Sequence, residues 1–386
     1  MFFSLTAGSK SNFSCSYRLG ELNLYTDQGW QERYVDDCQV IYKGYVDAFD
    51  LGTNLRAIIS QDRPKFSGNF CAICHDLSSG QISFKNDLWR GFPIYLNDDE
   101  ITNLNPGTRV AWTDSVIVLD QNFQIQEQKF DLIGPIETHP ITIDAAEHKI
   151  QQILLDKTRS FLSHNQLPIR VHLSGGVDSL LSYCLLRHLD AKVELVRCSH
   201  FDYDPFWLLN DSQIKENFWG YTQIHHWTEP CVLTSGAPGD EFMLRSPTTI
   251  DMLLKYRGLD TLAIISQQQH CLHYDYFTRD KHIDLFRNQK IDVDVPIEQF
   301  YWTLCNIVAN DWQHWHIGHT LTWTPLRDLE IFKIFLRLPS TYCLDQMFDS
   351  KLSINLIERL VPGSSDVLSD QKNSHNPMKN LLRLLF

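Results

Sequence analysis

A strand, a glycine turn and a helix follow one another in Ile169-Arg-Val-His-Leu-Ser-Gly-Gly-Val-Asp-Ser179 and the apolar pattern that continues to Leu189. Glycine has no Cβ, so successive N–H groups at the turn can point toward one anion, and the positive end of the helix dipole strengthens that site. A carboxylate beside a polyphosphate is repelled unless a divalent cation lies between them, so Asp178 predicts Mg²⁺ as well. The segment therefore predicts a strand-to-helix site for the phosphates of a nucleotide.

The type of phosphate loop indicates which bond of ATP is broken. The lysine of the loop Gly-x-x-x-x-Gly-Lys-Ser/Thr, which binds the terminal phosphates of ATP, is absent here. The run Ser174-Gly-Gly-Val-Asp-Ser179 instead resembles the pyrophosphatase loop of enzymes that split ATP into AMP and pyrophosphate. An ordinary Ser/Gly-rich turn is the alternative reading, and the flanking strand and helix favour the phosphate site.

Composition sets the protein class. The chain has 386 residues, of which 43% are hydrophobic and 12% aromatic, enough for large cores and most simply for two domains. No apolar run reaches the roughly 18 residues of a membrane span, and the first residues lack the charged and apolar regions of a signal peptide. The 10 cysteines are scattered, so we expect a reducing cytoplasm.

The net charge bears on the partners. A formal charge of −13 argues against a broad nucleic-acid surface, and the basic residues do not cluster into a stripe. We therefore expect small molecules or another protein as partners and no membrane. The sequence is compatible with a homo-oligomer.

The first third of the chain has the pattern of short strands separated by turns, for example Gln39–Gly44, Phe70–His75 and Ala111–Leu119. A turn-rich bridge over residues 134–140 follows, which places a domain boundary near residue 140. Asp144, with Glu147 three residues later, then predicts the capped start of a helix.

The second part alternates strands and helices. The strand Ile169–Leu173, the helix Leu180–Leu189 and the strand Val193–Cys198 form a βαβ pattern, which implies a parallel sheet with ligands at the carboxyl ends of its strands. The third strand is expected at Gln223–Trp227, and Cys231–Ser235 follows it too closely for a crossover, as if one helix were missing. Helical periodicity prevails from about residue 248, including Ile331–Leu336 and Leu352–Leu360.

Further segments resemble the asparagine synthetase family. Leu233-Thr-Ser-Gly-Ala-Pro-Gly-Asp-Glu-Phe242 is similar to the second ATP-side signature of that family, with Asp240 in the place of the second metal-binding aspartate. Thr324-Pro-Leu-Arg-Asp328 resembles the family stretch that ends in Pro-Phe-Leu-Asp. Lys351 matches the position of the catalytic lysine, with one residue of gap.

The first part resembles the class II glutamine amidotransferase domain that precedes the synthetase in this family. The matching pieces are Lys43-Gly44-Tyr45, Asp76–Gly80 and Asn86–Tyr95. The glutaminase needs an amino-terminal cysteine where Phe2 stands, and an oxyanion-hole asparagine where Lys43 stands. The resemblance therefore implies a domain that supports the synthetase and does not hydrolyse glutamine.

The resemblance implies an α/β fold. A degenerate Ntn-type αββα-like domain would span residues 1–140, and a Rossmann-like parallel-sheet synthetase domain with a helical carboxyl-terminal part would span residues 141–386. Relatives without the amino-terminal cysteine include β-lactam synthetases and lasso-peptide cyclases, which adenylate a carboxylate for attack by an amine. The family's glutamate is replaced by Ala237, and its Glu-x-Arg by Thr322 and Trp323, so the carboxylate need not be aspartate.

The implied activity is an ATP- and Mg²⁺-dependent ligase that adenylates a carboxylate, releases pyrophosphate and joins the acyl group to ammonia or an amine. Positioning and metal binding would supply most of the catalysis. Asp178 and Asp240 would bind the metal, and Lys351 would stabilise developing charge. The pyrophosphate would be held by Ser174, Gly175, Gly176, Asp178 and Ser179, and the adenosine bordered by Leu173, Cys198, Ser199 and Gly236.

Two other functions remain open at this point. One is a non-catalytic nucleotide-binding sensor or assembly protein, and the other is adenylation of a nucleobase or tRNA carbonyl. Two metal-like patterns carry less weight. Cys71 and Cys74 would point to opposite faces of a strand, and the spacing of His314, His316 and His319 fits no single helix face.

Overall fold

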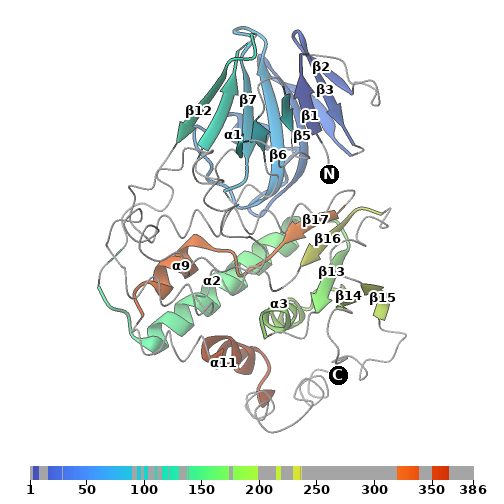
Figure 1. Ribbon diagram of the computed structural model, residues 1–386. Helices are drawn as coiled ribbons and strands as arrows, with labels where there is room; N and C mark the ends of the chain where they lie inside the picture. The colour runs from blue at the N-terminus through green and yellow to red at the C-terminus, as the bar shows by residue number, and fades with distance from the viewer. Residues whose placement is uncertain are drawn as a thin grey trace, which may run out of the picture.

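The computed structural model describes residues 3–7, 16–27, 29–88, 94–96, 100–102, 109–110, 115–120, 122–129, 137, 139–173, 177–198, 214–218, 229–234, 236, 320–338 and 350–364. Within them the chain has a mixed α/β fold with two antiparallel sheets and one parallel sheet (Figure 1). We call the described part of residues 3–129 the N-terminal half and that of residues 139–364 the C-terminal half. No described helix is long and apolar enough to cross a membrane.

The N-terminal half consists of two antiparallel sheets that pack face to face. Phe3 of the first sheet packs on Phe84 of the second, with ring centroids 5.8 Å apart. The first sheet has the order β10-β8-β9-β1-β3-β2, with β1 (Phe3–Thr6), β2 (Tyr17–Leu19), β3 (Leu22–Thr26), β8 (Tyr95–Leu96), β9 (Glu100–Thr102) and β10 (Arg109–Val110). The second has the order β12-β11-β7-β6-β5-β4, with β4 (Gln31–Val35), β5 (Cys38–Val46), β6 (Gly68–Asp76), β7 (Ile82–Asn86), β11 (Ser115–Leu119) and β12 (Ile125–Lys129).

The short helix α1 (Leu55–Ile59) covers the other face of the second sheet, where Leu55 and Ile58 join a separate apolar cluster. This arrangement explains the two cysteines of β6. Cys71 lies in the core between the sheets and Cys74 in the cluster under α1, and neither forms a disulfide. The prediction that they point to opposite faces of one strand is confirmed.

The predicted strands of the N-terminal half are largely confirmed. Gln39–Gly44 lies within β5 and Phe70–His75 within β6. Residues 115–119 of the third predicted strand form β11, and residues 111–114 lie outside the described residues. The turn between β6 and β7 is closed by Asp76, whose Oδ1 accepts hydrogen bonds from the backbone N–H groups of Ser78 and Ser79.

The C-terminal half contains the predicted parallel sheet. Its order is β15-β14-β13-β16-β17, with β13 (Ile169–Leu173), β14 (Val193–Cys198), β15 (Ile214–Phe218), β16 (Cys231–Thr234) and β17 (Thr320–Trp323). The strand order runs outward from β13 in one direction through β14 and β15, and in the other through β16 and β17. The order therefore reverses between β13 and β16, which is the switch point where open parallel sheets bind their ligands.

The third strand differs from the prediction. The strand beside β14 is Ile214–Phe218, whereas the expected strand at Gln223–Trp227 lies outside the described residues. Residues 219–230 then separate β15 from β16, which is enough chain for a crossover between parallel strands. The inference of a missing helix, which rested on a strand ending at Trp227, therefore loses its support.

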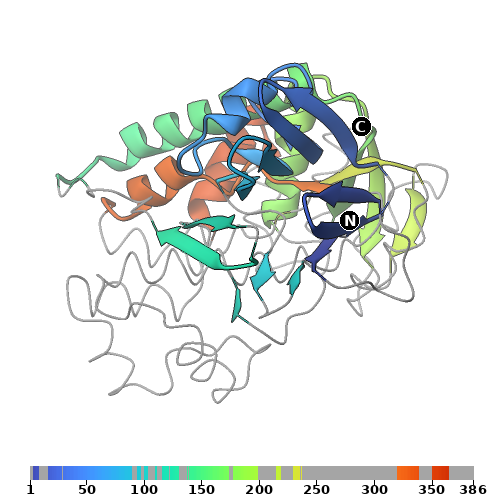
Figure 2. The same cartoon turned by 90° about the horizontal axis from the view of Figure 1, so that it is seen from above.

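In the described part of this half, the helices near the parallel sheet are α2 (Ile143–His164), α3 (Val177–His188), α9 (Leu329–Phe335) and α11 (Lys351–Leu360). They confirm the helical pattern expected at Leu180–Leu189, Ile331–Leu336 and Leu352–Leu360. The view from above shows the green helix α2 lying beside the orange helix α9, and the two are in contact (Figure 2).

The predicted cap of α2 is wrong by two residues. Thr142 is the N-cap, and its side-chain oxygen accepts a hydrogen bond from the backbone N–H of Ala145 at 3.3 Å. Asp144 lies in the first turn, where its negative charge is favourable at the positive end of the helix dipole. Glu147 does not cap this helix but makes contacts with α11, described below.

Candidate functional site

The site lies at the carboxyl ends of β13 and β16, the two neighbouring strands at the switch point. Val171 pairs with Thr234 in parallel register, and β13 continues to Leu173 while β16 ends at Thr234. Leu173 and Thr234 are both buried. The chain that leaves β13 enters α3, and the chain that leaves β16 reaches Gly236, so the two predicted ATP signatures emerge side by side.

Helix α3 is held rigidly at this point because it is buried on nearly every side. Leu180, Leu181 and Leu185 belong to the main core, and the helix contacts β13, α2 and α11. Asp178 and Ser179 form part of its first turn and are 7% and 2% exposed. The positive end of the helix and its first N–H groups are therefore fixed at the edge of the sheet.

Gly236 lies directly against this first turn. A Cβ added at Gly236 would be 2.6 Å from Cβ of Asp178 and closer still to the backbone nitrogen of Ser179. Real Cβ atoms do not approach other atoms so closely, and the neighbours here are backbone and the root of a buried side chain. Only glycine fits at this position, and it allows the loop after β16 to touch the start of α3.

The remaining predicted ATP-site residues divide into two groups. Cys198 ends β14, the strand next to β13, so its backbone reaches the same edge of the sheet. Ser174, Gly175, Gly176, Ser199, Ala237 and Asp240 lie outside the described residues. The structure thus brings Leu173, Asp178, Ser179 and Gly236 together, and the pairing of Asp178 with Asp240 stays a prediction.

Lys351 is the first residue of α11, and its side chain is exposed. The next residue, Leu352, is fully buried, and with Leu356 and Ile357 it joins α11 to the main core. Helix α11 packs against α3, so Lys351 belongs to an element that touches the helix carrying Asp178. Its catalytic role stays a prediction.

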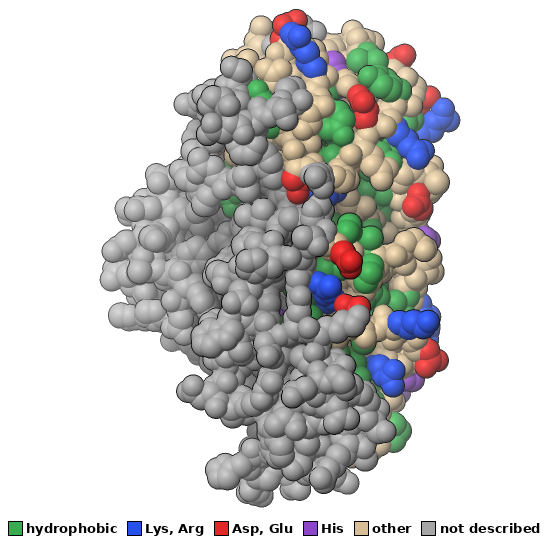
Figure 3. Space-filling view, turned by 90° about the vertical axis from the view of Figure 1, so that its right-hand side faces the viewer, with side chains coloured by type: hydrophobic (Ala, Val, Ile, Leu, Met, Phe, Trp, Pro, Cys, Tyr) green, Lys and Arg blue, Asp and Glu red, His purple; other side chains and the backbone are tan. Residues whose placement is uncertain are grey.

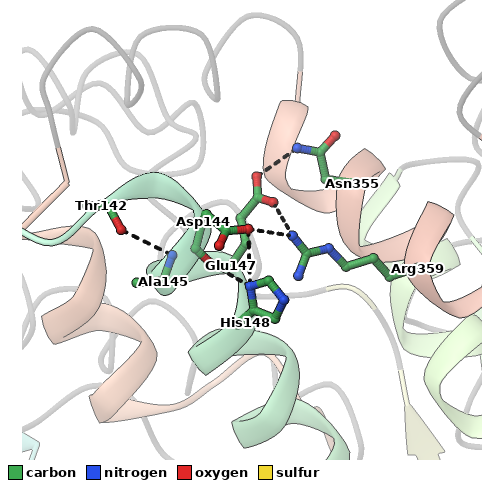
Figure 4. A network of polar contacts seen from close by, with 7 residues as sticks. All are labelled: Thr142, Asp144, Ala145, Glu147, His148, Asn355 and Arg359. Carbon is green, nitrogen blue, oxygen red and sulfur yellow. Dashed lines mark hydrogen bonds and ion pairs between the residues drawn. The ribbon is translucent and has the colours of Figure 1, made fainter.

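A buried carboxylate fixes α11 to α2 (Figure 4). Glu147 of α2 accepts a hydrogen bond from Nδ2 of Asn355 at 2.7 Å and one from Nη2 of Arg359 at 2.8 Å. The Glu147 side chain is 7% exposed, and Asp144 adds a second carboxylate 3.6 Å from Arg359. Sequence reasoning assigned Glu147 to a helix cap and missed this contact, because its partners are more than 200 residues away.

Lys43 occupies the position expected for an oxyanion-hole asparagine, on β5. Its ammonium donates a hydrogen bond to Oδ1 of Asp27 at 3.0 Å, and the indole N–H of Trp30 donates to the same oxygen at 3.0 Å. The Lys43 side chain is only 10% exposed. Burial lowers the pKa of Lys43, and the Asp27 carboxylate opposes that shift. The lysine is therefore engaged in a largely buried ion pair. Phe2 lies outside the described residues.

A second buried charge cluster, which no sequence motif indicated, lies where the two halves meet. Asp47 of the N-terminal half is buried, and its backbone carbonyl accepts hydrogen bonds from Ser160 and His164 of α2. Burial raises the pKa of Asp47 to about 6, with Lys157 and His164 opposing the shift and Asp328 adding to it. Lys157 lies 3.8 Å from Asp328, the residue that caps α9.

Comparison with models of protein families and with curated protein sequences finds no match. On the face shown in Figure 3, acidic and basic side chains of the described residues alternate without forming a patch of one sign.

Proposed function

We propose that the protein is an ATP- and Mg²⁺-dependent ligase that activates a carboxylate as an acyl-adenylate and joins it to ammonia or an amine. The observation that carries the proposal is the contact of Gly236 with Asp178 and Ser179 at the switch point of the parallel sheet. The two sequence signatures that resemble the ATP site of asparagine synthetases come from segments that are far apart in the sequence. Their described residues, Asp178 and Ser179 in one and Gly236 in the other, are in contact at the edge where parallel sheets bind nucleotides.

The residues present suit a magnesium nucleotide. The first turn of α3 offers N–H groups and a positive dipole end to phosphate oxygens, and Asp178 adds a carboxylate suited to Mg²⁺. Asp178 and Asp240 would hold the ion, which would neutralise charge on the pyrophosphate. Gly236 allows the loop after β16 to reach this turn, which a larger residue would prevent.

The proposed reaction has two steps. A carboxylate oxygen attacks the α-phosphorus of ATP, and the bond from that phosphorus to the pyrophosphate oxygen breaks. The amine nitrogen then attacks the acyl carbon, AMP leaves with the bridging oxygen, and the nitrogen loses one proton. Helix α3 would hold the departing pyrophosphate, and Lys351 would stabilise the charge that develops at the phosphates and the tetrahedral carbon.

Free ammonia or an amine, and not glutamine, is the proposed nitrogen source. Phe2 replaces the glutaminase nucleophile, and Lys43 is paired with Asp27 where an oxyanion donor is needed. In this proposal the N-terminal half hydrolyses no glutamine and supports the synthetase half through its packing contacts.

The carboxylate is proposed to differ from aspartate. Thr322 and Trp323 stand where the family carries Glu-x-Arg, and both take part in packing. Asn69 donates to the Thr322 hydroxyl at 2.7 Å, and the Trp323 ring stacks on Phe161 with centroids 4.1 Å apart. Neither side chain offers a charge to an amino-acid substrate.

A non-catalytic nucleotide-binding protein is the second candidate. The exposure of Lys351 favours it, because a catalytic ammonium acts most strongly when it is partly shielded from water. In this reading the nucleotide site at α3 is kept and the chemistry is lost.

Pyrophosphate release separates the two candidates. The wild-type protein is assayed with ATP and Mg²⁺ against a panel of carboxylates with ammonia or amines, and Lys351→Met is assayed in parallel. We expect release with at least one pair and a loss of about a hundredfold or more in Lys351→Met. Lys149→Met on α2 is the matched control, and it should keep the activity. Binding of ATP without release under any condition would support the non-catalytic candidate.

A further inference from the structure

Strand β17 ends the parallel sheet on the side of the N-terminal half (Figure 1). It pairs with β16 along one edge, and Thr234 at the end of β16 is opposite Trp323 at the end of β17. An uncovered edge strand leaves backbone groups without partners and is held only from one side. The carboxyl end of β17 is next to the switch point, so its position affects the proposed nucleotide site.

Two side chains of the N-terminal half bind this outer edge. The carbonyl oxygen of Thr322 accepts hydrogen bonds from the Tyr45 hydroxyl at 2.8 Å and from Nδ2 of Asn69 at 3.1 Å. The Asn69 amide also donates to the Thr322 hydroxyl at 2.7 Å. Asn69 is only 2% exposed, so water does not readily replace these bonds. The two side chains take the place of a neighbouring strand.

Aromatic packing reinforces the same contact. The Tyr45 ring meets Phe161 of α2 edge to face, with centroids 5.5 Å apart, and Phe161 stacks in turn on Trp323. Tyr45 thus contacts the backbone of β17 and the aromatic ring that supports its last residue. The three rings connect β5, α2 and β17 in one buried row.

The chain beyond β17 is held from the other side by α2. Lys157 donates a hydrogen bond to the carbonyl of Arg327 and pairs with Asp328. Ser160, one turn further along α2, donates to the carbonyl of Asp47 in the N-terminal half. Residues 322–328 are therefore held between the N-terminal half and α2. They include the segment that resembles the family's Pro-Phe-Leu-Asp stretch.

We propose that the N-terminal half is a positioning element for the nucleotide-binding edge, in which Tyr45 and Asn69 fix the carboxyl end of β17 beside the ends of β13 and β16. The proposal rests on the proposed function, because it assigns this edge to ATP. The N-terminal half lacks the residues expected for hydrolysing glutamine, and the proposal gives it another role. Its side chains Tyr45 and Asn69 take the place of a sixth strand at the edge of the parallel sheet. Tyr45 and Asn69 are positioning residues and do not touch the substrate.

The test uses the full chain with the double variant Tyr45→Phe/Asn69→Leu. Both changes keep the size of the side chain and remove the three hydrogen bonds to Thr322. Tyr42→Phe is the matched control, because Tyr42 is a buried tyrosine of the same strand whose hydroxyl bonds to Gln31 within the N-terminal half. Circular dichroism first confirms that each variant is folded at the temperature used.

Two measurements follow: hydrogen exchange of residues 320–328 by mass spectrometry, and calorimetric affinity for ATP with Mg²⁺. In the double variant we expect exchange to become faster by about tenfold or more and affinity to fall by about tenfold, the scale set by a few lost hydrogen bonds. Tyr42→Phe should change neither. If the double variant is too unstable, Tyr45→Phe alone is measured, with a smaller change expected in the same direction.

The outcomes distinguish this inference from the proposed function. Unchanged exchange at residues 320–328 overturns it, and so does faster exchange with unchanged affinity for ATP. If the wild-type protein binds no ATP, the proposed function fails and with it the assigned role of this edge. The exchange data then still decide whether Tyr45 and Asn69 anchor β17.

Discussion

Gly236 packs against Asp178 so closely that a Cβ on the glycine would lie 2.6 Å from Cβ of the aspartate. Asp178 lies in the first turn of α3, which follows β13, and Gly236 lies in the loop after β16, the neighbouring parallel strand at the point where the strand order reverses. Because these two residues are in contact, the two sequence signatures form one candidate site.

Gly236→Ala should damage both the fold and the site. The added methyl group meets the backbone of Ser179, so α3 or the loop after β16 must move. We expect a loss of about 1–3 kcal/mol in the free energy of unfolding, the scale of overpacking a tight core, and at least about tenfold weaker binding of ATP. Chemical denaturation and calorimetry measure the two effects.

Gly52→Ala is the control for that change. A Cβ at Gly52 would lie 3.0 Å from the Tyr42 hydroxyl and 3.6 Å from a carboxylate oxygen of Asp50, which are ends of side chains that can move. It should leave the affinity for ATP unchanged. Wild-type stability and affinity in Gly236→Ala would show that the loop does not lie where the structure places it.

Glu147 and Arg359 should be energetically coupled, because the carboxylate is buried and bonded to both Asn355 and Arg359. We expect Glu147→Ala to lower the free energy of unfolding by about 3 kcal/mol, since it leaves the partners without a buried acceptor. In a double-mutant cycle with Arg359→Ala, the coupling energy should be about 1–3 kcal/mol. Additive losses would mean that Glu147 and Arg359 are not energetically coupled. The exposed pair Asp156 and Arg159 on α2 provides the control cycle, with coupling below about 1 kcal/mol.

Asp47 should make stability depend on pH. Burial raises its pKa from 3.8 to about 6, so the folded protein binds a proton more tightly than the unfolded chain. The contribution of this group therefore stabilises the fold below about pH 4 and is lost as the pH rises through 6. Asp47→Asn removes this dependence. The stability of the variant relative to wild type should rise by about 2–3 kcal/mol between pH 4 and pH 7.

Urea denaturation at several pH values measures this difference. Asp156→Asn, an exposed change on α2, should show no comparable trend. A difference between Asp47→Asn and wild type that stays constant with pH would mean that Asp47 is ionised in the folded protein throughout this range.

The proposed function implies that glutamine is not hydrolysed, because Phe2 and Lys43 stand where the resemblance places the nucleophile and the oxyanion donor. We expect no glutamate above background from the wild-type protein or from Phe2→Cys, since Lys43 is engaged by Asp27 in both. Release of glutamate is measured over time at saturating glutamine. Robust hydrolysis by Phe2→Cys would show that the oxyanion site is intact.

The sequence predicted the local elements well and the long-range contacts poorly. Ile169–Leu173 and Val193–Cys198 match β13 and β14 at both ends, because each is an apolar run bounded by turn residues. The strand at residues 214–218 was missed because Ile214-Lys-Glu-Asn-Phe218 is largely polar and has no such run. The N-cap was misplaced because Thr142 and Asp144 are both residue types that suit a cap, and in the structure Thr142 accepts the capping hydrogen bond from Ala145.

Within the site, the sequence indicated Asp178, Ser179 and Gly236 because each belongs to a motif with a local pattern. The sequence did not indicate the contact between Asn69 and Thr322, because the two residues are 253 positions apart. Asp47 was missed for the same reason, since its burial depends on α2 packing against the N-terminal half. Contacts between the halves are set by tertiary packing, which a single sequence does not encode in any local pattern.

Calorimetric titration with ATP is the sharpest test of whether the edge formed by Asp178 and Gly236 binds a magnesium nucleotide. Wild type, Asp178→Asn and the exposed control Asp156→Asn are titrated with and without Mg²⁺. We expect binding that requires Mg²⁺, is at least about tenfold weaker in Asp178→Asn and is unchanged in Asp156→Asn. Equal affinity with and without the metal, or equal affinity in wild type and Asp178→Asn, would contradict this expectation.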